Sequence, residues 1–122
     1  MTVLNTQFSP WPSFSQEEAD AVSRVLLSNK VNYWTGNECR EFEKEFAAFA
    51  QTQYAVAVAN GTVALDLALK VLGVGAGDDV IVTSRTFLAS ASSIVTAGAN
   101  PIFADVELDS QNISVRTIEA VL

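Results

Sequence analysis

The stretch YAVAVANGTVALDLALKVL, residues 54–72, predicts a buried strand that passes through a short polar turn into a helix. Its first part, residues 54–59, is an apolar run with two β-branched valines and no helical period. The turn follows at Asn60-Gly61-Thr62, where glycine lacks a Cβ and asparagine tolerates turn dihedrals. Beyond the turn, leucine and alanine recur at helical spacing.

This turn has two interpretations. Free backbone N–H groups at a helix start point toward one spot, and the helix dipole and the Thr62 hydroxyl make that spot favourable for a phosphate or another anion. Alternatively, Asn60 or Thr62 caps an ordinary strand-to-helix turn that binds nothing. The segment alone does not separate these two interpretations.

Length and composition limit the partners and the location of the chain. Its 122 residues make one domain or part of one, and a net charge of −7 argues against nucleic acid or an anionic membrane surface as a partner. The single cysteine, Cys39, fits a reducing compartment. The sequence shows no signal peptide and no apolar run of the roughly 20 residues that cross a bilayer. We therefore expect a soluble, cytoplasmic protein.

The absence of histidine excludes several kinds of site. Ser-His-Asp and Cys-His nucleophilic arrangements and histidine-based zinc sites need a residue that the chain lacks. A single cysteine also excludes cysteine-rich metal sites, so we expect no metal site. Catalysis would have to use lysine, carboxylates, hydroxyl groups or a cofactor.

The order of the predicted elements indicates an α/β fold. Helices are expected after a capping box at Ser15 and after Asn37, and the second carries an aromatic stripe expected in the core, formed by Phe42, Phe46 and Phe49. Phe8 and Phe14 are expected to anchor the irregular N-terminal residues. Strands over residues 54–59, 79–83 and 101–104 then alternate with helices, the last of which starts at Ser114. This pattern predicts a mostly parallel sheet, with a helical region at 1–53 and a βαβαβα unit at 54–122.

Five short motifs stand in order along the chain. They are TG at 35–36 before FEKEFA at 42–47, NGTVAL at 60–65, GAGDDVIV at 75–82, TFLA at 86–89 and GANPIFADV at 98–106. With these motifs the chain resembles, from about Phe8 to Leu122, the N-terminal part of the DegT/StrS family of pyridoxal-phosphate (PLP) sugar aminotransferases. The resemblance implies the three-layer large domain of a fold-type-I aminotransferase, incomplete in this chain.

The resemblance also implies a function and site residues. Such enzymes are usually homodimers, and they transfer an amino group from an amino-acid donor to a nucleotide-linked keto-sugar for polysaccharide or glycan precursors. In them the cofactor phosphate would be held at Asn60, Gly61 and Thr62, and the ring of Phe87 would stack on the pyridine ring. Candidate substrate contacts are Thr35, Gly36 and Arg85. Arg85 departs from many relatives, which have a small or aromatic residue there, and two roles stay open for it: a structural one, or contact with an anionic group of the substrate.

The Schiff-base lysine of the family has no counterpart in this chain. The lysines present, Lys30, Lys44 and Lys70, do not match its motif, so the resemblance places that lysine beyond Leu122. We therefore expect the N-terminal segment of a longer enzyme, inactive by itself. Two alternatives remain: a PLP-dependent sugar dehydratase of the same family, with histidine replacing the lysine, or a truncated binding or regulatory protein without chemistry.

Overall fold

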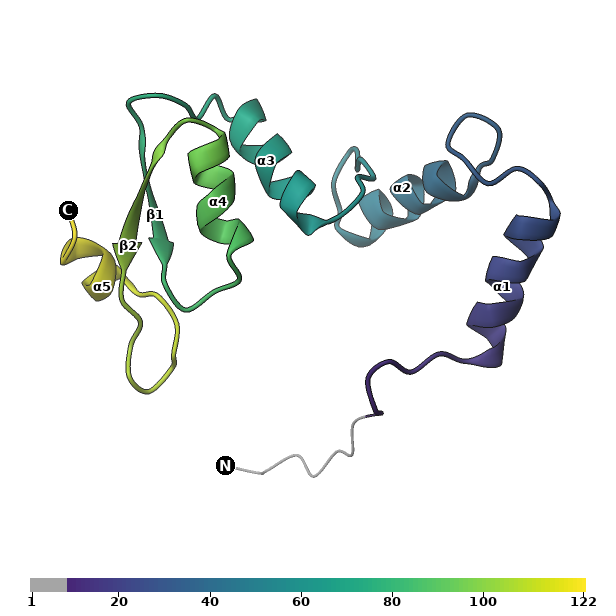
Figure 1. Cartoon of the computed structure of the whole chain (residues 1–122), viewed down its shortest axis with the longest axis horizontal. Coiled ribbons are helices and arrows are strands. Elements are labelled where there is room, and N and C mark those ends of the chain that lie inside the picture. Colours follow the sequence, from purple (N-terminus) through teal and green to yellow (C-terminus); the bar gives the residue numbers. More distant parts are fainter. Residues whose placement is uncertain (1–8) are drawn as a thin grey trace. The chain divides into compact units, whose positions relative to one another are not determined.

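The computed structural model describes residues 9–122, which fall into two compact units (Figure 1). Unit 1 is Met1–Ala57, described from residue 9 onward, and unit 2 is Val58–Leu122. The boundary between the two units therefore follows Ala57, whereas the sequence predicts that the second region begins at residue 54. In the part of the chain that is described, no helix is long and apolar enough to cross a membrane.

Unit 1 contains two helices, α1 (Gln16–Leu27) and α2 (Glu38–Phe49). The predicted capping box opens α1: the Glu18 N–H donates to Ser15 Oγ at 3.2 Å, and the Ser15 N–H donates to Glu18 Oε2 at 2.6 Å. The Glu18 carboxylate accepts hydrogen bonds from the Ser15 N–H and, at 2.8 Å, from the Ser15 hydroxyl, and these two bonds, the first more than the second, hold the pKa of Glu18 below its usual value. Asn37 precedes α2, but its side chain makes no capping hydrogen bond.

The aromatic stripe of α2 is exposed, so the prediction that it forms core is wrong for the described residues. The rings of Phe42 and Phe46 lie 5.6 Å apart and those of Phe46 and Phe49 lie 6.1 Å apart. Their exposed fractions are nevertheless 54%, 49% and 84%, because no described element covers this helix face. Phe14 is also exposed, so the prediction that it anchors the N-terminal residues is wrong for the described part of the chain, and Phe8 lies outside that part.

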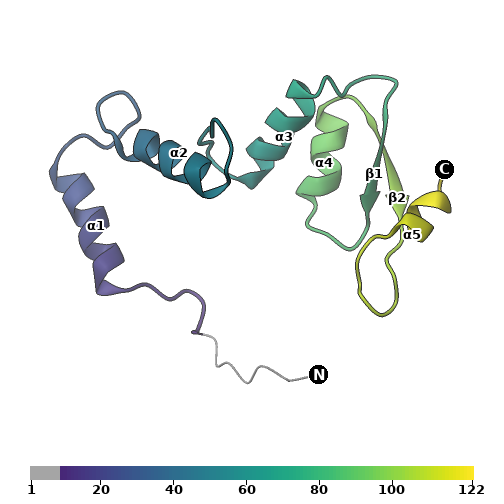
Figure 2. The same ribbon diagram turned by 180° about the vertical axis from the view of Figure 1, so that it is seen from behind.

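Unit 2 has a two-stranded parallel sheet with helices. Its elements are α3 (Gly61–Val71), β1 (Asp79–Thr83), α4 (Ala89–Thr96), β2 (Asn100–Ala104) and α5 (Val115–Glu119). The register runs from the pair Asp79↔Asn100 to the pair Thr83↔Ala104, and α4 connects the two strands. The second and third predicted strands are thus confirmed within one residue. Figure 2 shows α4 between α3 and the sheet.

Small side chains allow α4 to approach the sheet closely. Ile94 and Ser93 of α4 are 3% and 1% exposed, and Ala104 of β2 is 1% exposed. Ala89 and Ala99 complete the buried set of this unit's apolar residues. Since alanine buries little apolar area, this core contributes only a modest hydrophobic free energy.

The strand predicted over residues 54–59 is absent, and that prediction is wrong for this chain. These residues pair with no other strand among residues 9–122, and β1 pairs only with β2. A strand requires a hydrogen-bonded neighbour, and a single apolar segment without one forms no ladder. The observed element order is therefore α-α-α-β-α-β-α.

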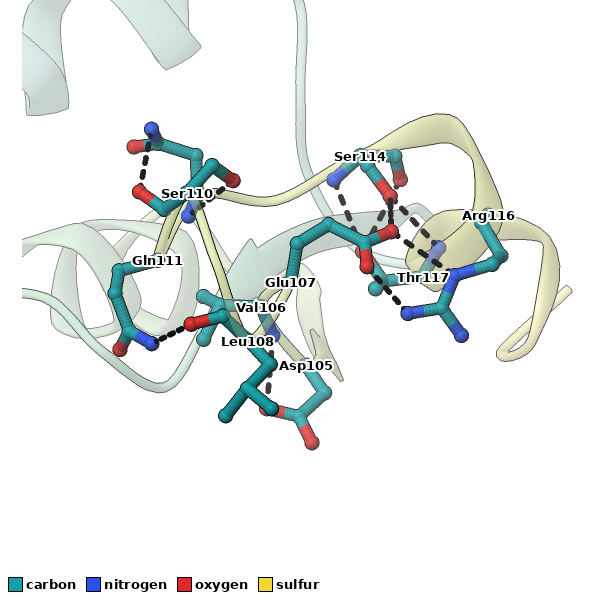
Figure 3. A network of polar contacts seen from close by, with 10 residues as sticks. Asp105, Val106, Glu107, Leu108, Ser110, Gln111, Ser114, Arg116 and Thr117 are labelled. Carbon is teal, nitrogen blue, oxygen red and sulfur yellow. Dashed lines mark hydrogen bonds and ion pairs between the residues drawn. The ribbon is translucent and has the colours of Figure 1, made fainter. Parts of the chain in front are cut away.

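A polar network connects the loop after β2 to the start of α5 (Figure 3). The carboxylate of Glu107 accepts hydrogen bonds from the Arg116 guanidinium and from the Ser114 hydroxyl. Ser114 also caps α5 by accepting from the Thr117 N–H at 3.3 Å, as its position in the sequence predicts. The network fixes the chain reversal between residues 105 and 117.

This network gives a pH dependence. The hydrogen bond from Arg116, followed by that from Ser114, lowers the pKa of Glu107 below its ordinary value of 4.5. Because the folded-state pKa is the lower one, the stabilisation is present above about pH 4.5 and is lost as pH falls through the folded-state value. We expect Glu107→Gln to flatten the acid side of the curve of melting temperature against pH in the full-length protein. Glu119→Gln, at an exposed position without a recorded ion pair, is the control; equal curves for both variants would contradict this role.

Candidate functional site

The turn at the start of α3 is capped by Asn60. Its side-chain oxygen accepts a hydrogen bond from the Val63 N–H at 3.0 Å, and its own backbone precedes the first helical residue, Gly61. Between the two caps that the sequence allowed, the structure selects Asn60. The hydroxyl of Thr62 is therefore not used for capping, and it makes no recorded hydrogen bond within residues 9–122.

Two backbone donors stay free at this turn. The N–H groups of Gly61 and Thr62 belong to the first helical turn, where no intrahelical acceptor exists, and no acceptor for them is recorded in the described part of the chain. The space around Gly61 is open, since a Cβ there would meet no atom within 4 Å. An anion can bind at this turn. The two N–H groups and the Thr62 hydroxyl can donate hydrogen bonds to it, and the positive end of the α3 dipole attracts it.

The loop between β1 and α4 carries Phe87 and Arg85. Phe87 is 77% exposed, so its ring is not part of the core that the described residues form. Two hydrogen bonds stabilise this loop: the Arg85 N–H donates to Thr83 Oγ1 at 3.2 Å, and the hydroxyls of Thr86 and Ser90 lie 2.8 Å apart. The backbone around the exposed ring is thereby held in place.

The structure brings the turn and this loop to the same end of unit 2. Both views show the start of α3, the carboxyl end of β1 and the start of α4 at that end (Figures 1 and 2). Ligands of parallel α/β sheets bind outside the carboxyl ends of the strands. Asn60, Gly61, Thr62, Arg85 and Phe87 thus share the edge where a ligand is expected.

Thr35 and Gly36 lie in unit 1, and local contacts explain both. Asn32 Oδ1 accepts hydrogen bonds from the backbone N–H groups of Trp34 and Thr35 and from the Thr35 hydroxyl, at 3.0, 3.0 and 3.1 Å. The Gly36 N–H donates to the Asn32 carbonyl at 2.8 Å, and Gly36 is buried. This asparagine organises the loop, because it accepts hydrogen bonds from the Thr35 hydroxyl and from the Gly36 backbone N–H.

Gly36 supports a stability prediction. A Cβ at this position would lie 2.3 Å from the Lys30 carbonyl oxygen, which is backbone and must shift. We expect Gly36→Ala to destabilise the full-length protein by about 1–3 kcal/mol in urea unfolding, as overpacking does. Gly75→Ala is the matched control, because its Cβ would lie at an ordinary 3.7 Å from the nearest atom, the Ala97 carbonyl oxygen. A loss no larger than that of the control would contradict the close approach.

Glu43 is a structural contact that sequence reasoning missed. One carboxylate oxygen accepts from the Ala57 N–H at 2.9 Å, and the other accepts from the Tyr33 hydroxyl at 3.3 Å. The signal was its position four residues before Ala47, the buried residue of α2, which places both on one helix face. Glu43 thus holds the segment that leads to the turn. Among the residues described, no group of three or more histidine, cysteine, aspartate or glutamate side chains could hold a metal ion.

Comparisons with known proteins identify relatives over nearly the whole chain. The model of the DegT/DnrJ/EryC1/StrS aminotransferase family matches residues 12–122. The spore coat polysaccharide biosynthesis protein SpsC of Bacillus subtilis (strain 168) is 40% identical over all of this chain, which spans 31% of that protein. The GDP-perosamine synthase of Escherichia coli O157:H7 is 43% identical over 88% of this chain and 29% of its own length.

Solved structures show the same fold. An aminotransferase from Psychrobacter cryohalolentis matches 95% of this chain and 29% of its own, with a TM-score of 0.88 and 65% identity. A sugar aminotransferase of Streptococcus pneumoniae, solved in PLP and pyridoxamine-phosphate (PMP) forms, matches 97% of this chain and 29% of its own, with a TM-score of 0.81 and 35% identity.

These structures settle the fold and the family. They confirm the predicted α/β fold of a fold-type-I aminotransferase, of which this chain spans about three-tenths of the length. Aminotransferases of this family depend on PLP. With a family match over residues 12–122, the chain belongs to the DegT/DnrJ/EryC1/StrS aminotransferase family.

Proposed function

We propose that the protein carrying this chain is a PLP-dependent aminotransferase that transfers an amino group from an amino-acid donor to a nucleotide-linked keto-sugar. The observation that carries the proposal is the open turn at Gly61 and Thr62, whose donors have no protein acceptor within residues 9–122. A phosphate group fits these donors in number, charge and position. The residues present therefore suit the phosphate of PLP.

The chain's own part in the reaction would be binding and orientation. PLP, when bound, supplies the electron sink that amino-group transfer requires. Gly61 and Thr62 would hold its phosphate at one end, and the exposed ring of Phe87 would lie against the pyridine ring without competing for its proton-active atoms. Thr35 and Gly36 stay proposed substrate contacts, although their contacts in unit 1 favour a role in forming the loop.

The sugar and the assembly are further parts of the proposal. The names of the matched relatives describe a GDP-linked sugar and a polysaccharide, which supports a nucleotide-linked substrate on the way to surface glycans. We also propose a homodimer that works in the cytoplasm, with residues 1–53 as a helical region and 54–122 as the α/β part. The names of one matched relative, a synthase, and of the matched aminotransferase structures favour the aminotransferase over the dehydratase and the non-catalytic alternatives.

Phe87 provides the experiment for the cofactor ring. In the full-length protein we expect Phe87→Ala to weaken PLP binding by about 0.5–1.5 kcal/mol, the usual contribution of an aromatic stack, and to shift the visible absorbance of the bound cofactor. Phe87→Tyr keeps the ring and should have a mild effect. The matched control is Leu88→Ala, because Leu88 is the next residue and is 75% exposed.

Two results would contradict the stacking of Phe87 on the cofactor ring. If Phe87→Ala unfolds the protein while the folded fraction binds PLP with unchanged affinity and absorbance, Phe87 packs in the complete core instead. If Leu88→Ala lowers PLP affinity as much as Phe87→Ala, the loop and not the ring is responsible.

A further inference from the structure

The cations of unit 2 differ in their surroundings. They are Lys70, Arg85 and Arg116. Arg116 forms an ion pair with Glu107, which fixes it at the start of α5. Lys70 lies in the last turn of α3, at the end of that helix opposite to the turn at Gly61. Only Arg85 lies in the loop between β1 and α4, at the end of unit 2 that also carries the start of α3 (Figures 1 and 2).

The guanidinium of Arg85 is available. The side chain is exposed, and within residues 9–122 no hydrogen bond or ion pair of its guanidinium is recorded. The one carboxylate that follows a strand at this edge, Asp105 after β2, accepts from the Val106 N–H at 2.8 Å and forms no ion pair with Arg85. The backbone beneath Arg85 is nevertheless fixed by its N–H bond to Thr83 Oγ1.

We propose that Arg85 is a specificity-determining residue that binds an anionic oxygen group of the substrate. This inference rests on the proposed function. A planar guanidinium takes a carboxylate or a phosphate through two parallel hydrogen bonds. The phosphate of the cofactor would have its own donors at Gly61 and Thr62, which leaves Arg85, in the same loop as Phe87, for a second anion.

Two substrates can supply this anion. The amino donor has an α-carboxylate, and a nucleotide-linked sugar has a diphosphate. Both present paired oxygens that fit the guanidinium, so the shared chemistry is a bidentate oxyanion. The net charge of −7 on the chain repels such anionic groups. A cation without an ion pair, such as Arg85, would attract them locally at this end of unit 2.

The experiment compares Arg85→Gln with Lys70→Gln in the full-length, PLP-loaded protein. Each variant removes one positive charge from unit 2, but only Arg85 lies at the ligand edge. The first arm mixes the protein with L-glutamate and follows the visible absorbance of the cofactor as a function of glutamate concentration. The second arm measures how GDP and UDP, which carry the diphosphate, inhibit that change.

We expect Arg85→Gln to weaken binding about tenfold or more in one arm, which corresponds to one charge-assisted contact. The PLP affinity of Arg85→Gln should stay at the wild-type value, as should both arms for Lys70→Gln. A change in the glutamate arm identifies the carboxylate, and a change in the nucleotide arm identifies the diphosphate. Arg85→Lys should recover part of the loss, since it restores the charge but not the planar fork.

Three results would overturn the inference. The first is no change in either arm for Arg85→Gln. The second is an equal change for Arg85→Gln and Lys70→Gln, which would indicate only the loss of one positive charge from the overall electrostatic field of the protein. The third is a loss of PLP affinity in Arg85→Gln, which would assign the guanidinium to the cofactor. A wild-type protein that takes up no PLP would remove the proposed function and this inference with it, whereas the other failures appear only in the variants.

Discussion

Residues 1–122 produced as an isolated polypeptide are expected to show no cooperative thermal unfolding. Among the described residues the buried apolar set consists of four alanines and one isoleucine: Ala47, Ala89, Ala99, Ala104 and Ile94. Burial of so few methyl and methylene groups does not offset a conformational entropy cost of about 1–2 kcal/mol for each ordered residue. Large side chains such as Trp34, Phe49 and Phe87 are instead 84%, 84% and 77% exposed.

The strands lead to the same expectation. Within the described residues β1 pairs only with β2, so each strand has an edge without a partner. Open apolar edges are templates for aggregation. The isolated polypeptide should therefore be poorly soluble, or fold only together with further sequence of the protein.

Calorimetry and analytical ultracentrifugation of the isolated polypeptide, with the full-length protein as the control, check this prediction. The expected result is a single sharp transition for the full-length protein and a broad or absent one for residues 1–122. A cooperative melt of a monomeric 1–122 polypeptide would show that the exposed side chains are not the surfaces on which folding depends. We also expect this polypeptide to retain no PLP through dialysis and to transfer no amino group.

The parts of the fold that depend on neighbouring residues could be predicted from the sequence. The capping box at Ser15, the strand Asp79–Thr83 and the cap at Ser114 were predicted at the positions where they occur, because their determinants lie within a few residues. Local chemistry also placed the turn at Gly61 correctly at a helix start. Turn residues, caps and short apolar runs determine these features.

The parts that depend on distant partners could not be predicted. Residues 54–59 have the composition of a strand, yet the described chain offers them no neighbour to pair with. The aromatic stripe of α2 has the helical spacing that is typical of core residues, yet no described element packs on it. In the same way, the spacing from Glu43 to Ala47 indicates the helix face of Glu43, but it does not indicate the two hydrogen-bond partners, which lie 10 and 14 positions away.

Thr62→Val is expected to weaken PLP binding to the full-length protein by about 1.5–3 kcal/mol, the size of one hydrogen bond to a charged group. Valine has nearly the shape of threonine, so the variant removes the hydroxyl and keeps the helix start. Asn60 would still cap α3 through the Val63 N–H, which the substitution does not touch. A loss of PLP affinity in this variant would therefore come from the missing hydroxyl and not from a change in the fold.

Thr96→Val is the matched control for this prediction. Thr96 is the last residue of α4, is exposed and makes no recorded hydrogen bond through its side chain within residues 9–122. The same chemical change there should leave PLP affinity at the wild-type value. If both variants lose affinity equally, the effect comes from general destabilisation and the turn has no special role.

The turn at Gly61 and Thr62 is the proposed binding site for the phosphate of PLP. The most direct test is to measure the affinities of wild-type and Thr62→Val full-length protein for PLP and for pyridoxal, which has the same ring and aldehyde but no phosphate. We expect Thr62→Val to lower PLP affinity by about 10- to 150-fold and to leave pyridoxal affinity unchanged. Equal losses for both compounds, or no loss for PLP, would contradict it.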